Sequence, residues 1–187
     1  MGDVASLMKC RGGRLTLEEG GPILLQTLQG LAFAHKRGFV HRDIKPRNIL
    51  LRGKEGRWSG RLSDLGLAKN FEQAGLSGLT ITGEKIGTFQ FMPREQVTQF
   101  KRFKPVSDVW AMGATCYYIL TGFYPRNHPD TLDQVKVILQ GKAIPIRTRD
   151  PRIPNPVAEV IDRSLADKVS ERYQHAGEMY EALKKVL

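Results

Sequence analysis

One short stretch of this chain constrains its fold more than any other. Residues 41–48 read His-Arg-Asp-Ile-Lys-Pro-Arg-Asn, and residues 64–66 read Asp-Leu-Gly. Asp43 and Lys45 are two residues apart, so an extended loop would point both side chains to one side. The chain must therefore fold so that an acid and a cation lie together, with further polar groups close by in sequence.

A β-hairpin is predicted between these two motifs, with one strand on each side of the turn-rich residues 53–60. In the register we expect, Leu51 faces Arg61. The same register places Asn48 opposite Asp64. An amide oxygen beside a carboxylate suits a small hard cation such as Mg²⁺, with phosphate oxygens completing its shell. The alternative is a hairpin whose ends carry turn residues by chance.

Apolar residues at helical spacing predict that helices surround this hairpin. Ser107 could cap the second of them. Residues 145–156 are proline-rich and predict a loop. The predicted fold class is mainly α with a small β-hairpin. The expected helices cover residues 22–36, 108–120, 132–139, 157–165 and 175–187.

Composition limits the possible partners and the compartment. With 187 residues, 41% of them hydrophobic, the chain can form one domain with a core. Its net charge of +10 is scattered, apart from a cluster at residues 101–104, so a nucleic-acid binder is not favoured. Cys10 and Cys116 lack metal-ligand spacing, and the most apolar stretch, residues 109–124, is too interrupted to span a membrane. No leader pattern opens the chain, so we expect a cytoplasmic protein without a transmembrane segment.

Taken together, the two motifs resemble the catalytic loop and the metal-binding motif of protein kinases. Lys45, two residues after the acid, makes the resemblance closer to serine/threonine kinases than to tyrosine kinases, and the chain as a whole resembles those of the bacterial type. No glycine-rich G-x-G-x-x-G loop is present, and too little chain precedes residue 41 to build the small lobe. The chain therefore resembles the large C-terminal lobe alone, with the N-terminal lobe absent. The implied division is one domain over 1–187, with a catalytic loop at 41–48, an activation segment at 64–95 and a helical subdomain at 105–187.

The resemblance implies roles for four polar residues. Asp43 would be the catalytic acid/base that orients the acceptor hydroxyl and takes its proton. Lys45 would neutralise charge on the transferred phosphoryl group. Asn48 and Asp64 would hold Mg²⁺ on ATP, so that Asn48 belongs to both the catalytic and the metal site.

Two further residues would contact the nucleotide. Leu50 would form the floor under the adenine, with plain hairpin core as the alternative. Asp3 resembles a hinge-proximal acid that contacts the ribose, and the alternative is an exposed terminal acid.

Other matches concern support and regulation. The Asp108 carboxylate would accept backbone hydrogens from the catalytic loop, and Glu95 would pair with Arg172. Pro93-Arg94-Glu95 departs from the family's usual Ala-Pro-Glu, with arginine in the place of proline. Arg42 would pair with a phosphate on a phosphorylated residue of the activation segment. The alternative is that the hydroxyls of this segment are merely solvated. The candidate acceptors are Ser77, Thr80 and Thr82.

The function these features favour is a serine/threonine protein kinase that uses ATP and Mg²⁺ to phosphorylate Ser or Thr hydroxyls of a protein substrate. The alternative is an inactive kinase-like lobe that binds partners. A small lobe, supplied in cis or in trans, would be needed for activity. We therefore expect the chain alone to have little activity.

Overall fold

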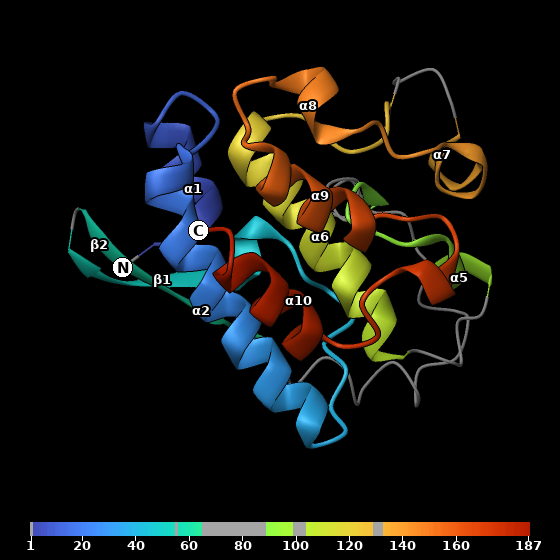
Figure 1. Ribbon diagram of the computed structural model, residues 1–187, viewed down its shortest axis with the longest axis horizontal. Coiled ribbons are helices and arrows are strands. Elements are labelled where there is room, and N and C mark those ends of the chain that lie inside the picture. Colours follow the sequence, from blue (N-terminus) through green and yellow to red (C-terminus); the bar gives the residue numbers. More distant parts are fainter. Residues whose placement is uncertain (1, 55, 65–88, 99–103, 129–132) are drawn as a thin grey trace.

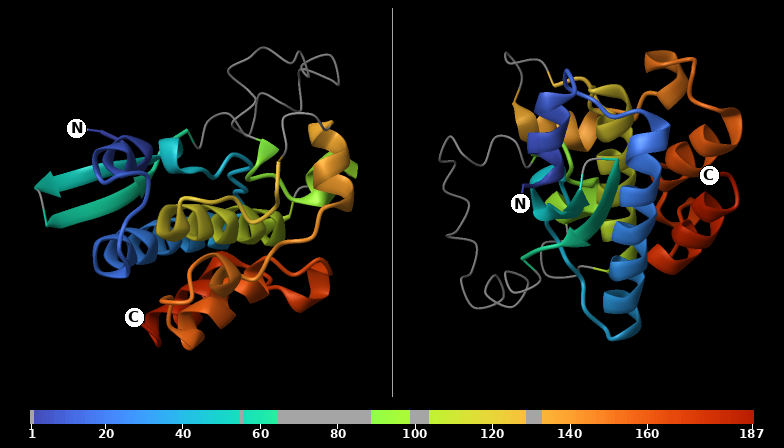
Figure 2. Two further views of the ribbon diagram at one scale, coloured as in Figure 1. Left: turned by 90° about the horizontal axis from the view of Figure 1, so that it is seen from above. Right: turned by 90° about the vertical axis from the view of Figure 1, so that its left-hand side faces the viewer.

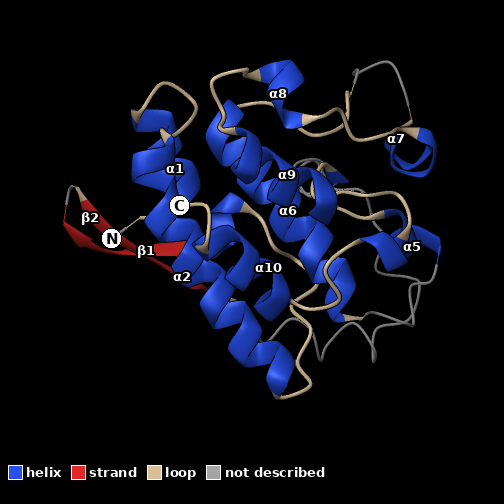
Figure 3. Cartoon of the chain, viewed as in Figure 1, coloured by secondary structure: helices blue, strands red, loops and turns tan. Residues whose placement is uncertain are grey.

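Helices make up most of the computed structural model of the chain, and a two-stranded β-hairpin packs against one side of them (Figure 1, Figure 3). The structure describes residues 2–54, 56–64, 89–98, 104–128 and 133–187. The predicted fold class, mainly α with one small hairpin, is confirmed. The elements in chain order are α1 (Val4–Cys10), α2 (Leu17–Lys36), the 3₁₀ helix η1 (Pro46–Asn48), β1 (Ile49–Lys54), β2 (Arg57–Leu62), α5 (Arg94–Thr98), α6 (Pro105–Thr121), α7 (Gln134–Gln140), α8 (Ile146–Arg149), α9 (Asn155–Ser164), the 3₁₀ helix η4 (Val169–Glu171) and α10 (Ala176–Lys184).

The elements form layers. Figure 2 shows α2 and α6 side by side in the middle of the molecule, with α1 and the hairpin on one side and α9 and α10 on the other. The core lies between these layers and includes Ile23, Leu28, Trp110, Met112, Ile161 and Met179. In the described part of the chain, no helix combines the length and the apolar character that crossing a membrane requires.

Helix α2 begins five residues before the predicted start. Thr16 and Glu19 form a capping box, in which each side chain accepts the other residue's backbone N–H. These bonds provide acceptors for two backbone amides at the start of the helix. The helix also accommodates Pro22 in its interior. Gly38, with a φ of 77°, follows the last turn in the left-handed conformation that commonly ends helices. This helix delivers the chain to residues 41–48.

Helix α6 is buried almost all round, as its sequence predicts, but the predicted cap is wrong. Ser107 lies buried inside the first turn, and Lys104 occupies the N-cap position. The reason is Pro105, whose fixed φ suits the first helical position and which needs no hydrogen-bond acceptor for its nitrogen. The helix ends at Gly122, which has a φ of 76°.

The hairpin register differs from the predicted one by a single residue. Leu51 pairs with Gly60 rather than with Arg61, and both strands extend into the segment expected to be a turn. Packing on α2 is the physical reason. A Cβ on Gly60 would lie 2.6 Å from Thr27 Oγ1 and 2.7 Å from Ile23 O, so a glycine must face the helix there.

Other differences concern short elements. The sequence pattern did not indicate α1 or α5, and the predicted loop at 145–156 contains α8 and the start of α9. Helix α7 begins at Gln134, whereas the first residue of its predicted range lies outside the described residues. The helix expected at 175–187 ends earlier, at Lys184.

Candidate active site

The backbone of residues 41 and 42 is held by one buried carboxylate at the start of α6. Asp108 Oδ2 accepts the His41 N–H at 2.6 Å, and its Oδ1 accepts the Arg42 N–H at 2.8 Å. The ring of His35 approaches the same carboxylate, with Nε2 at 3.0 Å from Oδ2. Arg42 has a φ of 71°, which a side chain-bearing residue adopts at some strain. The two hydrogen bonds that Asp108 accepts hold this strained backbone in place.

Asp43, Lys45 and Asn48 come together just after this anchor. Lys45 Nζ lies 2.8 Å from Asp43 Oδ2. Asn48 Nδ2 donates to the Asp43 carbonyl oxygen at 2.7 Å and to its carboxylate at 2.9 Å. Since the amide nitrogen of Asn48 is directed to Asp43, its oxygen is the end that could bind a cation. The side chains of Asp43 and Lys45 remain 26% and 20% exposed, so a substrate can reach them.

Asp64 lies at the open end of the hairpin, one residue beyond the partner of Asn48. The Ser63 N–H donates to the Asn48 carbonyl oxygen at 2.9 Å, so Ser63, not Asp64, stands opposite Asn48. The predicted pairing of Asn48 with Asp64 is therefore wrong by one residue. Ser63 Oγ still lies 3.3 Å from both the Asn48 carbonyl oxygen and the Asp64 carboxylate, which keeps the two predicted ligands at the same end.

The donor set fits a magnesium ion that keeps other ligands. An amide oxygen and a carboxylate are hard donors, and Mg²⁺ usually takes one or two protein oxygens together with phosphates and water. Within the described residues, no cluster of three or more His, Cys, Asp or Glu side chains could hold a metal by itself. A cation at Asn48 and Asp64 would therefore depend on oxygens from a bound nucleotide.

His41 connects the loop to the hairpin. The ring is buried, and its Nε2 lies 2.7 Å from the Ser63 carbonyl oxygen. The Asp43 N–H donates to His41 Nδ1 at 3.4 Å, so Nε2 carries the proton and donates to Ser63. The ring thus connects residues 41–48 to the residue that follows β2.

Asp3 and Leu50 lie next to each other, through an isolated antiparallel bridge. The Asp3 carboxylate caps α1, because its Oδ1 accepts the Ser6 N–H at 2.7 Å. Leu50 is 48% exposed, whereas Ile49 and Leu51 on the other face of β1 are buried. The alternative that Leu50 is hairpin core is therefore wrong. The structure brings Asp3 and Leu50 together at one edge of the hairpin.

The end of the predicted activation segment is anchored to two parts of the molecule. Arg172 donates to both carboxylate oxygens of Glu95, at 2.5 and 3.3 Å, and its side chain is 1% exposed. Gln96 Nε2 donates to the Arg42 carbonyl oxygen at 3.1 Å. Several predicted features lie outside the described residues: Leu65, Gly66, Ser77, Thr80, Thr82, Thr88 and the cluster 101–103.

Sequence reasoning missed three residues that support the site, namely His35, Gln96 and Arg126. His35 offered one weak signal, because it is a polar residue near the end of the predicted helix that precedes residues 41–48. Gln96 and Arg126 carry no local signal, because their partners lie 54 and 34 residues away along the chain. Only tertiary packing makes them part of the site.

The two cysteines have no catalytic signature. Both are free, Cys10 exposed and Cys116 buried. Burial raises the pKa of the Cys116 thiol to about 12, so it stays protonated and uncharged at neutral pH. Cys116 is therefore a residue of the apolar core.

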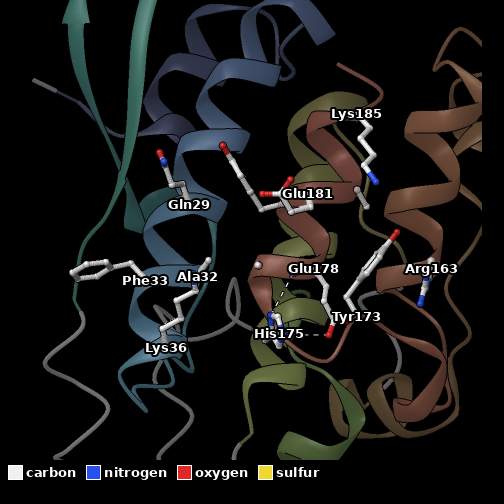
Figure 4. A pocket seen from close by; sticks show the side chains of 13 residues that line it. Gln29, Ala32, Phe33, Lys36, Arg163, Tyr173, His175, Glu178, Glu181 and Lys185 are labelled. Atoms are coloured by element: carbon white, nitrogen blue, oxygen red, sulfur yellow. Dashed lines mark hydrogen bonds and ion pairs between the residues drawn. The ribbon is translucent and has the colours of Figure 1, made fainter.

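A surface cavity of about 770 Å³ lies between α2, α10 and the end of α9, away from the predicted site (Figure 4). Its wall includes Phe33, Lys36, Arg163, Tyr173, Glu178 and Glu181. Charges of both signs surround it, and none of the six predicted site residues lines it. The cavity therefore indicates no particular ligand chemistry.

The whole chain is similar to protein kinases. A family model described as "Protein kinase domain" matches residues 1–185. The serine/threonine-protein kinase PknA of Mycobacterium tuberculosis is 31% identical over 92% of this chain and 38% of its own length. A probable serine/threonine-protein kinase of Clostridium perfringens is 29% identical over 93% of this chain and 24% of its own length. The chain thus spans well under half of these relatives.

Solved kinase structures share the fold. The Rad53 kinase domain, solved with SCD2 and AMPPNP, superposes with a TM-score of 0.74 at 24% identity, covering 98% of this chain and 65% of that one. The Mycobacterium tuberculosis PknI kinase domain gives a TM-score of 0.68 at 20% identity, covering 98% of this chain and 62% of that one. At such identities the likeness concerns the fold alone.

Proposed function

The chain belongs to the protein kinase family, and from this premise we propose that it carries the catalytic loop of a serine/threonine protein kinase. The reaction would transfer the terminal phosphoryl group of ATP to a Ser or Thr hydroxyl of a protein substrate. The observation that carries the proposal is the contact of Asp43 with both Lys45 and Asn48, at 2.8 and 2.9 Å. An acid, a cation and an amide in contact suit phosphoryl transfer, which depends on positioning and charge neutralisation.

Each residue has a role that its position supports. Asp43 orients the acceptor hydroxyl and takes its proton as the oxygen bonds to phosphorus and the link to the leaving nucleotide breaks. Lys45 neutralises charge on the phosphoryl oxygens from beside the acid. Asn48 and Asp64 would hold Mg²⁺, which would supply further charge neutralisation when bound with ATP. Leu50 offers an exposed apolar surface for the adenine, with Asp3 beside it.

Activity of this polypeptide would require a small lobe, in cis or in trans, to cover the phosphates. The described residues form only a two-stranded sheet, and the Leu50 side chain is 48% exposed. The same observations favour a second candidate, an inactive kinase-like lobe that docks partners through this surface. The reducing cytoplasm is the setting we propose, because both cysteines are free.

Calorimetric titration with ATP, with and without Mg²⁺ and a supplied small lobe, tests the proposal. We expect magnesium-dependent binding that Asp64→Asn weakens by about tenfold or more, because a charged metal ligand becomes neutral. Asp43→Asn should leave nucleotide binding intact and abolish peptide phosphorylation. Glu159→Gln, an exposed carboxylate on α9, is the matched control.

Nucleotide binding that ignores both Mg²⁺ and Asp64→Asn would contradict the kinase proposal. Binding without any phosphorylation, even with the small lobe present, would favour the docking module. Robust phosphorylation by the chain alone would contradict its need for a small lobe.

A further inference from the structure

Two arginines from distant parts of the chain converge on a single backbone carbonyl at the end of α7. Arg94 Nη2 donates to Gly141 O at 2.8 Å, and Arg126 Nε donates to the same oxygen at 3.1 Å. Arg94 Nε also donates to Ile138 O at 3.3 Å. Carbonyls at a helix C-terminus lack helical partners and carry the negative end of the helix dipole, so guanidinium groups suit them.

Arg94 and Arg126, the arginine pair, also bind a second segment each. Arg126 Nη1 donates to the Met92 carbonyl oxygen at 2.9 Å, and its guanidinium lies 4.2 Å from the centre of the Trp110 ring. Arg94 Nη2 forms an ion pair with Asp167 Oδ1 at 3.1 Å. The arginine pair therefore joins the end of the activation segment to α7 and to the chain after α9.

Arg126 is the more buried of the two, with 2% of its surface exposed. Burial, and then the positive charge of Arg94, lower its pKa to about 10. The side chain is still charged at neutral pH. A buried cation with two carbonyl acceptors and an aromatic ring beneath it is firmly oriented, because leaving any of these partners would expose an unpaired charge.

The segment held by the arginine pair is in direct contact with the catalytic loop. Within α5, Glu95 is paired with the buried Arg172, and Gln96 donates to the Arg42 carbonyl oxygen. Arg42 is the residue before the proposed acid Asp43. A continuous set of hydrogen bonds thus connects the end of α7, residues 92–96 and the catalytic loop.

We propose that Arg94 and Arg126 are positioning residues, which lock residues 92–96 to α7 and thereby hold the catalytic loop for phosphoryl transfer. In this chain Arg94 stands where the family usually has proline, and the proline lies one residue earlier, at Pro93. The inference deepens the proposed function and rests on it.

Amide hydrogen exchange of the 187-residue chain tests the coupling without requiring activity. In Arg94→Met and Arg126→Met we expect exchange to speed up by about tenfold or more in residues 92–98 and also in 39–48, since each loses hydrogen bonds from a charged donor. Exchange in α2 should not change. Arg94→Lys keeps a cation for Asp167 and Gly141 and should rescue at least part of the protection.

The control is Arg57→Met, which removes an exposed arginine at the start of β2, on the opposite side of the molecule from α5 (Figure 1). It should leave exchange in both segments unchanged. If Arg126→Met fails to fold, Arg94→Met carries the test alone, because its side chain is 27% exposed and removal leaves no large cavity.

Faster exchange in 92–98 without any change in 39–48 would overturn the proposal, and so would uniformly faster exchange across the chain. With a small lobe supplied, the variants should lower kcat for a peptide while leaving the KM for ATP unchanged. A wild-type chain that binds no magnesium nucleotide would count against the kinase function instead, since the exchange experiment does not depend on it.

Discussion

At the scale of single residues, Asp108 is a buried side chain that holds several segments together. Its buried carboxylate accepts hydrogen bonds from the successive backbone amides of His41 and Arg42 and contacts the His35 ring. The Ala176 N–H at the start of α10 donates to His35 Nδ1 at 3.1 Å, so the ring proton resides on Nε2 and points to Asp108. One carboxylate therefore links α2, α6, α10 and the loop that carries Asp43.

We predict that Asp108→Asn lowers the free energy of unfolding by about 3 kcal/mol, because an NH₂ group would replace one charged acceptor oxygen and face another donor. Urea denaturation measures this loss, and the exposed Glu159→Gln provides a carboxylate control. A loss indistinguishable from that of the control would mean that the loop does not depend on this anchor.

At the scale of elements, the hairpin is held in register by its contact with α2. Gly60 on β2 lies against Thr27 and the Ile23 carbonyl, closer than any side chain would permit. The same contact turns Ile49 and Leu51 inward and leaves Leu50 exposed. The position of a glycine, rather than the turn at the tip, therefore decides which residues of β1 face outward and which face the core.

A pair of glycine substitutions tests this contact. Gly60→Ala should destabilise the protein by about 1–3 kcal/mol, because the added methyl group overpacks the interface between β2 and α2. Gly30 lies in α2, and a Cβ added there would have nothing within 4 Å. Gly30→Ala should therefore stabilise the protein by about 0.5–1 kcal/mol. Thermal denaturation of both variants is the measurement; equal effects would contradict the packing argument.

At the scale of the whole molecule, Asp150 ties together segments that are far apart in sequence. Arg14, between α1 and α2, donates to its Oδ2 at 2.7 Å. Arg152 donates to both of its oxygens, at 2.7 and 2.8 Å. Hydrogen bonds from Arg152, together with the charges of both arginines, hold the pKa of the Asp150 carboxyl well below its usual range.

This depressed pKa predicts a pH-dependent stability. A carboxyl whose pKa is lower in the folded than in the unfolded state stabilises the protein above the unfolded value of about 4 and loses that contribution as the pH falls. Asp150→Asn should therefore lower Tm by a few degrees at pH 7. The difference in Tm between the variant and the wild type should become smaller as the pH falls below about 4. Tm measured from pH 7 to pH 2 tests this, and a gap independent of pH would contradict it.

Asp162 offers a matched comparison with the opposite sign. Burial raises the pKa of its carboxyl, so ionisation is disfavoured in the folded state. The Tm of Asp162→Asn, relative to that of the wild type, should consequently rise as the pH rises. The relative Tm of Asp150→Asn should fall over the same range.

Features that depend on neighbours along the chain could be predicted from the amino-acid sequence. The apolar spacing in α2, α6, α9 and α10 predicts these helices, because a helix repeats its geometry every few residues. The contacts among Asp43, Lys45 and Asn48 also follow from short spacing, since these residues lie within one loop and the 3₁₀ turn that ends it.

Features that depend on contacts between distant segments could not be predicted without the folded structure. Packing of Gly60 on α2 shifted the hairpin register by one residue and placed Ser63, not Asp64, opposite Asn48. The arginine pair and the His35 bridge join segments that are 15 to 141 residues apart. Such contacts depend on the fit of surfaces and the pairing of buried polar groups, and these exist only once the chain has folded.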